Sequence, residues 1–74
     1  MTESSIDLSG LKCPLPALKT RKALTRLAAG DRLSVIATDP LAAVDIPNLV
    51  RETGDVLVES GRAGDRLSFV IEKT

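Results

Sequence analysis

The sequence predicts a small α/β domain in which a four-stranded sheet carries two helices on one face. Three patterns support this prediction: short runs of strand-like alternation, two longer amphipathic stretches between them, and a glycine-bounded loop near the end. The expected order is strand, helix, strand, helix, strand, strand. Right-handed crossovers would place both helices on the same side of the sheet. The 74 residues leave room for one domain, expected to span residues 1–74.

The first strand and the first helix are expected within the N-terminal third. Residues 4–8 alternate weakly between apolar and polar side chains, as in a short strand. A helix is expected at about 14–29, because Pro14 and Pro16 suit a first helical turn. Gly30 would then supply a left-handed C-terminal cap.

A second strand is expected at 32–38, where Leu33, Val35 and Ala37 occupy alternate positions and would face the core. Asp39 and Pro40 suit the N-cap and the first position of a second helix, which would end at Gly54. Pro47 interrupts that pattern. The second helix is therefore expected to be either kinked, or split so that 41–44 form a separate turn and the regular helix begins near Asp45.

Two antiparallel strands are expected at 55–60 and 66–72, joined by the loop 61–64. The predicted core consists of apolar side chains that these alternations and the first helix turn inward. They are Ile6, Leu8, Leu24, Leu27, Leu33, Val35, Val56, Val58, Leu67, Phe69 and Ile71.

The composition excludes several kinds of chemistry. There is no histidine and one cysteine, so a Cys-His nucleophile pair, an internal disulfide, a Cys-x-x-Cys pair and multi-cysteine metal sites are impossible. Neither a cofactor nor a metal is expected. Ten basic and ten acidic residues cancel and aromatic residues make up 1%, which argues against direct nucleic-acid or membrane binding. Residues 1–8 lack the apolar core of a secretory signal, so a cytoplasmic location is expected.

The segment from Gly10 to Pro16 carries most of the chemical information. Cys13 falls at the start of the first helix, between Lys12 and Pro14. Unpaired N–H groups and the helix macrodipole favour an anion there, so the pKa of the thiol is expected to be lowered towards neutrality. A reactive thiolate would then need no general base.

Charge is distributed unevenly along the chain. Residues 8–30 carry five basic side chains and no acidic one, and Lys19, Lys22 and Arg26 fall on one helical stripe. With Leu15 on the outer side, this helix could dock an acidic protein partner. Taken alone, the stripe is more typical of a solvated face than of a docking site, and a lone cysteine is often a buried structural residue.

In Gly10-Leu11-Lys12-Cys13-Pro14-Leu15-Pro16 and the order of elements, the chain resembles the TusA-like (SirA-like) sulfur-carrier family. The signature of that family is a Cys-Pro-x-Pro motif that opens the first helix. The resemblance extends to Arg21-Lys22, Thr38-Asp39-Pro40 and Asp45-Ile46-Pro47.

The resemblance implies a two-layer sandwich with sheet order 1-2-4-3 and an antiparallel fourth strand. It also implies that Cys13 accepts sulfane sulfur as a persulfide and passes it to another protein. The donor would be a cysteine desulfurase or a rhodanese and the acceptor a relay protein, with tRNA thiolation, cofactor maturation and sulfur oxidation as alternative pathways. Gly10, Lys12, Pro14 and Pro16 would support the site of a monomeric carrier. The expected partner-binding residues are Leu15, Lys19, Arg21, Lys22, Asp39 and Asp45, although both aspartates are first interpreted as helix caps.

Two other classes of function remain open at this point. In a non-catalytic binding module, the basic helix or the open sheet face would regulate a partner and Cys13 would be structural. RNA binding by fold analogy is the third hypothesis, and the balanced charge and the scarcity of aromatic residues argue against it.

Overall fold

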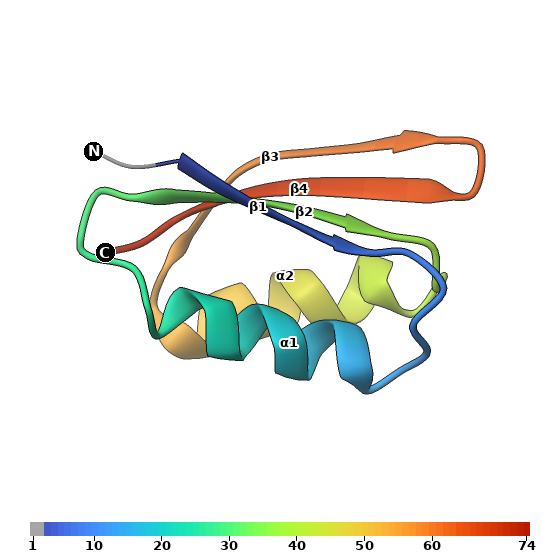
Figure 1. The fold of residues 1–74 in the computed structure, drawn as a ribbon, viewed down its shortest axis with the longest axis horizontal. Helices are drawn as coiled ribbons and strands as arrows, with labels where there is room; N and C mark the ends of the chain where they lie inside the picture. Colours follow the sequence, from blue (N-terminus) through green and yellow to red (C-terminus); the bar gives the residue numbers. More distant parts are fainter. Residues whose placement is uncertain (1–2) are drawn as a thin grey trace.

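The computed structural model describes residues 3–74 and contains a four-stranded sheet with two helices on one face (Figure 1). Residues 1 and 2, part of the segment expected to carry no secretory signal, lie outside the described residues. The sheet order is β1-β2-β4-β3, so the predicted fold class and strand order are confirmed. In chain order the elements are β1 (Glu3–Leu8), α1 (Leu15–Leu24), β2 (Arg32–Ala37), α2 (Ala42–Thr53), β3 (Val56–Ala63) and β4 (Arg66–Glu72).

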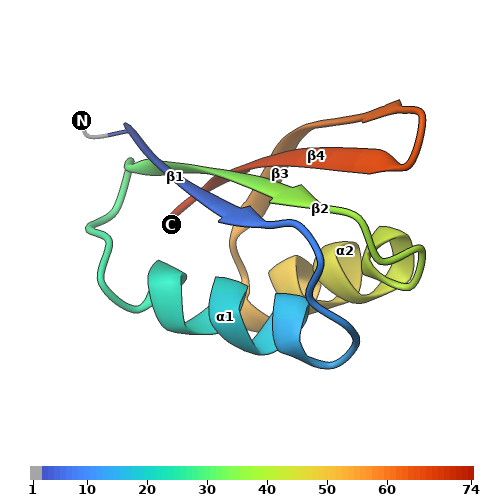
Figure 2. The same ribbon diagram turned by 45° about the vertical axis from the view of Figure 1, so that its right-hand side comes forward.

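The sheet is mixed, with β1 parallel to β2 and β4 antiparallel to both of its neighbours. Figures 1 and 2 show both helices on the same face of the sheet, while the opposite face is uncovered. Because β1 and β2 are parallel, the loops that lead into α1 and α2 leave the same edge of the sheet. Within the described residues, neither helix is long and apolar enough to cross a membrane.

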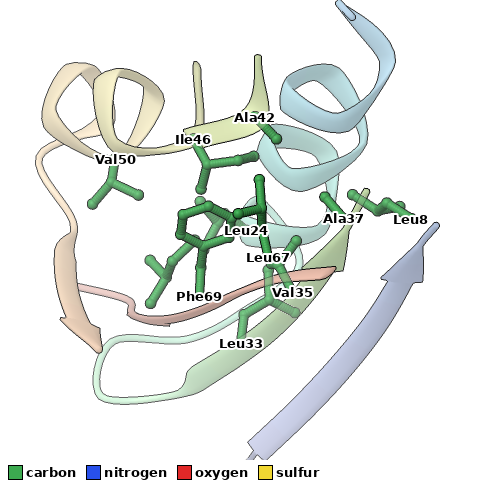
Figure 3. Packing of buried hydrophobic residues seen from close by; sticks show 11 residues of the cluster. Leu8, Leu24, Leu33, Val35, Ala37, Ala42, Ile46, Val50, Leu67 and Phe69 are labelled. Atoms are coloured by element: carbon green, nitrogen blue, oxygen red, sulfur yellow. The ribbon is translucent and has the colours of Figure 1, made fainter. Parts of the chain in front are cut away.

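The core lies between the helices and the inner face of the sheet, and Figure 3 shows its side chains pointing toward one another. Most of the predicted core residues are buried, and Ile6 and Leu27 pack against them partly exposed. Four buried residues of α2 are missing from the predicted core, because the helical pattern was uncertain around Pro47. They are Ala42, Ile46, Leu49 and Val50. The cluster comprises Leu8, Leu24, Leu33, Val35, Ala37, Ala42, Ile46, Val50, Leu67, Phe69 and Ile71.

The prediction that Val56 and Val58 belong to the core is wrong. Their side chains are 47% and 41% exposed, whereas Leu57 pairs with buried Ile71 and packs against the core. The register then shifts between Leu57 and Glu59. Because side chains alternate along a strand, an inward Leu57 turns both flanking valines outward, so the prediction chose the wrong face of this strand.

The hairpin turn is also shorter than predicted. β3 continues to Ala63, which pairs with Arg66, so only Gly64 and Asp65 form the turn. Gly64 has a φ of 64°, in the left-handed region that two-residue hairpin turns favour. Most of the predicted loop 61–64 is therefore strand.

α1 ends at Leu24, earlier than the predicted end at residue 29. The hydroxyl of Thr25 donates to the carbonyl of Lys22 at 2.6 Å, which is the carbonyl that a continuing helix would offer to Arg26. The N–H of Arg26 instead bonds three residues back, so the helix tightens and stops. Gly30 does not cap this helix; its φ is 92° and its N–H donates to a carbonyl near the C-terminus.

α2 begins at Ala42, later than the predicted start at Asp39 and Pro40. Asp39 accepts the N–H of Leu41 on its carboxylate at 3.1 Å and the N–H of Ala42 on its backbone carbonyl at 2.9 Å. Asp39 therefore caps the turn that leads into the helix, while Leu41 occupies the N-cap position without a side-chain cap.

Pro47 lies inside a single helix, so the alternative of a split second helix is wrong. The proline cannot donate to the carbonyl of Ala43, but Ala43 is exposed, so water can satisfy that carbonyl. Gly54 ends the helix with a φ of 81°, which confirms the predicted left-handed cap.

A buried carboxylate ties the C-terminus to the end of α2. Asp55 accepts hydrogen bonds from the N–H of Thr74 at 3.1 Å and the hydroxyl of Thr53 at 2.8 Å, and Lys73 Nζ lies 3.9 Å away. Burial by itself would raise the pKa of Asp55, but these donors and the lysine hold it below its usual range.

We expect Asp55→Asn to lower the free energy of unfolding at pH 7 by about 1–3 kcal/mol, because the donors lose a charged acceptor. The depressed pKa makes the contribution of Asp55 fully present above about pH 4, the ordinary value of an aspartate, and lost as the pH falls through the folded-state value. Urea unfolding should show a wild-type advantage that shrinks below pH 4. An advantage independent of pH would contradict this account.

Thr20 on α1 is fully buried, and its hydroxyl has no hydrogen-bond partner within residues 3–74. Burying an unpaired hydroxyl is costly, and valine has almost the same shape. We expect Thr20→Val to raise the free energy of unfolding by about 1 kcal/mol, measured by urea unfolding. The control is Thr25→Val, which removes a hydroxyl that does have a partner and should not stabilise the protein.

Candidate functional site

The candidate site is the loop that joins β1 to α1 and contains Cys13. The side chain of Cys13 is exposed, so the thiol is accessible as the sequence predicts. Cys13 precedes the helix, whose N-cap is Pro14, and the Cys13–Pro14 peptide bond is cis. Gly10 has a φ of 82° and its N–H donates to the Thr38 hydroxyl at 2.8 Å, which ties this loop to the end of β2.

Two carboxylates from the loop after β2 and from α2 hold the cysteine. The backbone N–H of Cys13 donates to the carboxylate of Asp39. The thiol donates to Oδ2 of Asp45, in the first turn of α2, with an Sγ–Oδ2 distance of 3.0 Å. Residues far apart in the sequence therefore meet, because the loops after the two parallel strands leave the same edge of the sheet.

The expectation of a lowered thiol pKa is wrong. The hydrogen bond to Asp45 raises the pKa of Cys13, and desolvation and the negative charges of Asp45 and Asp39 raise it further. The helix start offers little compensation, because Pro14 and Pro16 have no N–H and the N–H of Leu15 donates to the backbone carbonyl of Lys12.

The anionic form of Asp39 is stabilised by its surroundings. Hydrogen bonds from the N–H groups of Leu41 and Cys13 lower the pKa of Asp39, and the charge of Lys12 lowers it further. Lys12 thus acts electrostatically on Asp39. The positive charge of Lys12 therefore favours the ionised form of a neighbouring carboxylate, whereas the sequence suggested that it would favour a thiolate.

A groove of about 330 Å³ runs from Cys13 between α1 and α2. Apolar side chains, among them Leu18 and Leu49, lie beside polar ones from both helices. An ion pair between Arg21 and Glu52, 3.1 Å apart, joins the two helices along this groove. The geometry places Arg21 in the same groove as the thiol.

Exposed apolar side chains surround this end of the molecule. Leu15 is exposed as predicted, and Leu18, Leu41 and Val44 are 54, 55 and 58% exposed. The last three are not in the predicted site. A usable signal was present, because Leu18 follows Leu15 at helical spacing and therefore shares its outward face.

The remaining predicted residues are divided between surface and interior. Lys12, Lys19 and Lys22 are exposed, whereas Pro16 is buried and anchors the start of α1 against the fold. Arg26 lies beyond the end of α1, so the predicted three-residue helical stripe is reduced to Lys19 and Lys22. Among residues 3–74, no group of three or more cysteine or carboxylate side chains could hold a metal ion.

Fold and site together define a class of small two-layer domain that presents one accessible thiol beside two carboxylates. Comparison with known proteins identifies the family within that class. Residues 4–73 match the family model described as "Sulfurtransferase TusA". The chain belongs to the TusA family, so the resemblance inferred from the sequence is confirmed.

Three relatives match this chain along nearly their whole length. The sulfur carrier protein TusA of Allochromatium vinosum is 40% identical over 72 residues, which cover 97% of this chain and 95% of the relative. A relative in Neisseria meningitidis serogroup A is 39% identical over 72 residues, covering 97% of each chain. One in Bacillus subtilis is 38% identical over 72 residues, covering 97% of this chain and 96% of its own.

Proposed function

We propose that this chain is a sulfur carrier that accepts sulfane sulfur as a persulfide on Cys13 and passes it to an acceptor protein. The accessible thiol in a chain of the TusA family carries the proposal. An exposed cysteine contributes little to the core, so the alternative of a purely structural cysteine is not favoured. We place the carrier in the reducing cytoplasm, where a free thiol persists.

The transfer needs only one reacting side chain from this protein. Sγ of Cys13 attacks the terminal sulfur of a donor persulfide, R–S–SH. A sulfur–sulfur bond forms on Cys13 while the donor S–S bond breaks. The donor sulfur leaves as a thiolate and takes up the proton that Sγ releases, so no external oxidant or reductant is required. A repetition of the same exchange with an acceptor thiol unloads the carrier.

Partner docking is proposed to use the surface around the thiol, which we name the docking rim. Its apolar part provides area that a partner can bury, and its basic part on α1 favours an acidic partner surface. Arg21 is paired with Glu52, and Asp39 and Asp45 contact the cysteine itself, so these three shape the site from within. The docking rim comprises Leu15, Leu18, Leu41, Val44, Lys19 and Lys22.

The carrier function is tested by incubating the purified protein with a cysteine desulfurase and cysteine and then measuring its intact mass. The expected result is a mass gain of one sulfur atom that disappears after treatment with a reductant. A protein that gains no sulfur from either a desulfurase or a rhodanese would contradict the proposal. The choice among downstream pathways would follow from the acceptor protein that then removes the sulfur.

Leu18→Glu is expected to slow sulfur loading by about tenfold, because a charge at a buried contact costs about 1–2 kcal/mol of binding. Leu18 is exposed in the free protein, so folding should be unaffected. The matched control is Val58→Glu, an equally drastic change at an exposed apolar residue in β3. Equal loading rates for both variants, measured from mass spectra over time, would exclude Leu18 from the docking rim.

A further inference from the structure

The thiol of Cys13 is accessible but is held in a hydrogen bond that opposes its ionisation. The Sγ–Oδ2 distance of 3.0 Å makes the carboxylate of Asp45 the acceptor of the thiol proton. A thiol must ionise to attack a sulfur atom, and ionisation here would place a thiolate directly against a carboxylate. In the free carrier, this hydrogen bond therefore keeps the sulfur in its less reactive, protonated form.

Among the described residues, all the influences resolved on the pKa of Cys13 raise it, and none of them comes from a cation. Lys12 acts on Asp39, and Arg21, which lines the same groove, is bound to Glu52. Asp39 also faces the cysteine, through the backbone N–H, and adds a second negative charge. The charged groups around Cys13 are thus Asp45, Asp39, Lys12, and the Arg21–Glu52 pair.

We propose that Asp45 is a positioning residue that holds the Cys13 thiol protonated, and that a cationic side chain on the sulfur-donating partner releases the thiol by pairing with Asp45. The inference rests on the proposed function of Cys13. Once a partner cation neutralises Asp45, the thiolate is no longer repelled, and the exchange described above proceeds with the same bonds broken and formed. The Sγ proton leaves to water and is recovered by the departing donor thiolate.

A simple nucleophile would not need the hydrogen bond between the Cys13 thiol and Asp45. A carrier whose thiolate was permanently exposed would react with any electrophile it met, whereas this thiol becomes nucleophilic when the correct charge arrives. The raised pKa of Cys13 agrees with the geometry. Asp45 therefore acts through its hydrogen bond with the thiol of Cys13.

The first test measures alkylation of Cys13 by iodoacetamide, an uncharged reagent, as a function of pH. We expect Asp45→Asn to move the midpoint to lower pH and to speed alkylation at pH 7.5 by about three- to tenfold, because one pKa unit is a factor of ten in thiolate. The matched control is Asp65→Asn in the hairpin turn, which removes the same charge elsewhere and should leave the wild-type profile unchanged. An unshifted midpoint in Asp45→Asn would overturn the proposal.

The second test measures the role of a partner cation with two small disulfides as probes. Cystamine carries ammonium groups, whereas 2-hydroxyethyl disulfide is neutral, and both form a mixed disulfide with Cys13. The wild-type protein should favour cystamine by a ratio that falls with added salt and that falls by at least about threefold in Asp45→Asn. A ratio equal in wild type and Asp45→Asn, or insensitive to salt in the wild type, would overturn the cationic-partner step.

These outcomes can be separated from failure of the carrier function itself. Alkylation and mixed-disulfide formation need no desulfurase, so they report on Asp45 even if no sulfur is ever loaded. Should Asp45→Asn fold poorly, the salt dependence of the wild-type cystamine ratio still decides the question. A protein that loads sulfur but shows no Asp45 effect would retain its proposed function and lose this inference.

Discussion

Cys13→Ser is expected to abolish sulfur loading completely, with no residual mass gain under conditions that load the wild-type protein. Serine keeps the size and the hydrogen-bonding capacity of the side chain, so it can still donate to Asp45. A hydroxyl, however, does not ionise near neutral pH and cannot form a persulfide. The chain contains one cysteine, so no other residue can substitute for it.

The control for this variant is its stability. Cys13 is exposed and absent from the core, so urea unfolding of Cys13→Ser should match the wild type within about 0.5 kcal/mol. Loss of loading with unchanged stability would assign the effect to the sulfur atom. Loading that survives in Cys13→Ser would place the sulfur elsewhere and refute the proposed mechanism.

Phe69→Ala is expected to lower the free energy of unfolding by about 3–5 kcal/mol, because it leaves a large cavity in a small core. Phe69 is 4% exposed and lies in the cluster between the helices and the sheet (Figure 3). Whole domains are stabilised by about 5–15 kcal/mol, and a chain of 74 residues has few other large side chains with which to fill the space.

Thermal and urea unfolding followed by circular dichroism would measure this loss. Val70→Ala is the matched control, since the neighbouring side chain of β4 is only partly buried and faces the opposite side of the sheet. It should cost less than about 1.5 kcal/mol. Similar losses for both variants would mean that Phe69 is not a central packing residue.

The fold could be predicted from the sequence because its signals are local. Alternation in β2 and β4 identifies the inward faces correctly, and Gly54 ends α2 as expected. Errors arise where a single hydrogen bond overrides the pattern or where both faces of a strand carry apolar residues. The Thr25 hydroxyl ends α1 early, and in β3 the inward side chain is Leu57, so Val56 and Val58 face outward.

Only the part of the site that depends on neighbouring residues in the chain could be predicted. The accessible position of Cys13 follows from neighbouring residues in the chain, namely the prolines that open a helix. The acceptor of its thiol proton lies 32 residues away, and nothing local in the sequence indicates that Asp45 meets the sulfur. A local argument from the helix dipole therefore gave the wrong direction for the pKa of Cys13.

The hydrogen bonds that hold Thr74 to Asp55 have a practical consequence for immobilising the protein on a surface. β4 ends beside the start of β2, whereas Cys13 lies in the loop that follows the end of β1, next to the end of β2. The last residue and the thiol therefore lie at opposite ends of the sheet. A tether extended from Thr74 would leave along a fixed direction, because that residue is bonded to Asp55. Molecules anchored in this way to a bead or a sensor chip would all present their sulfur outward.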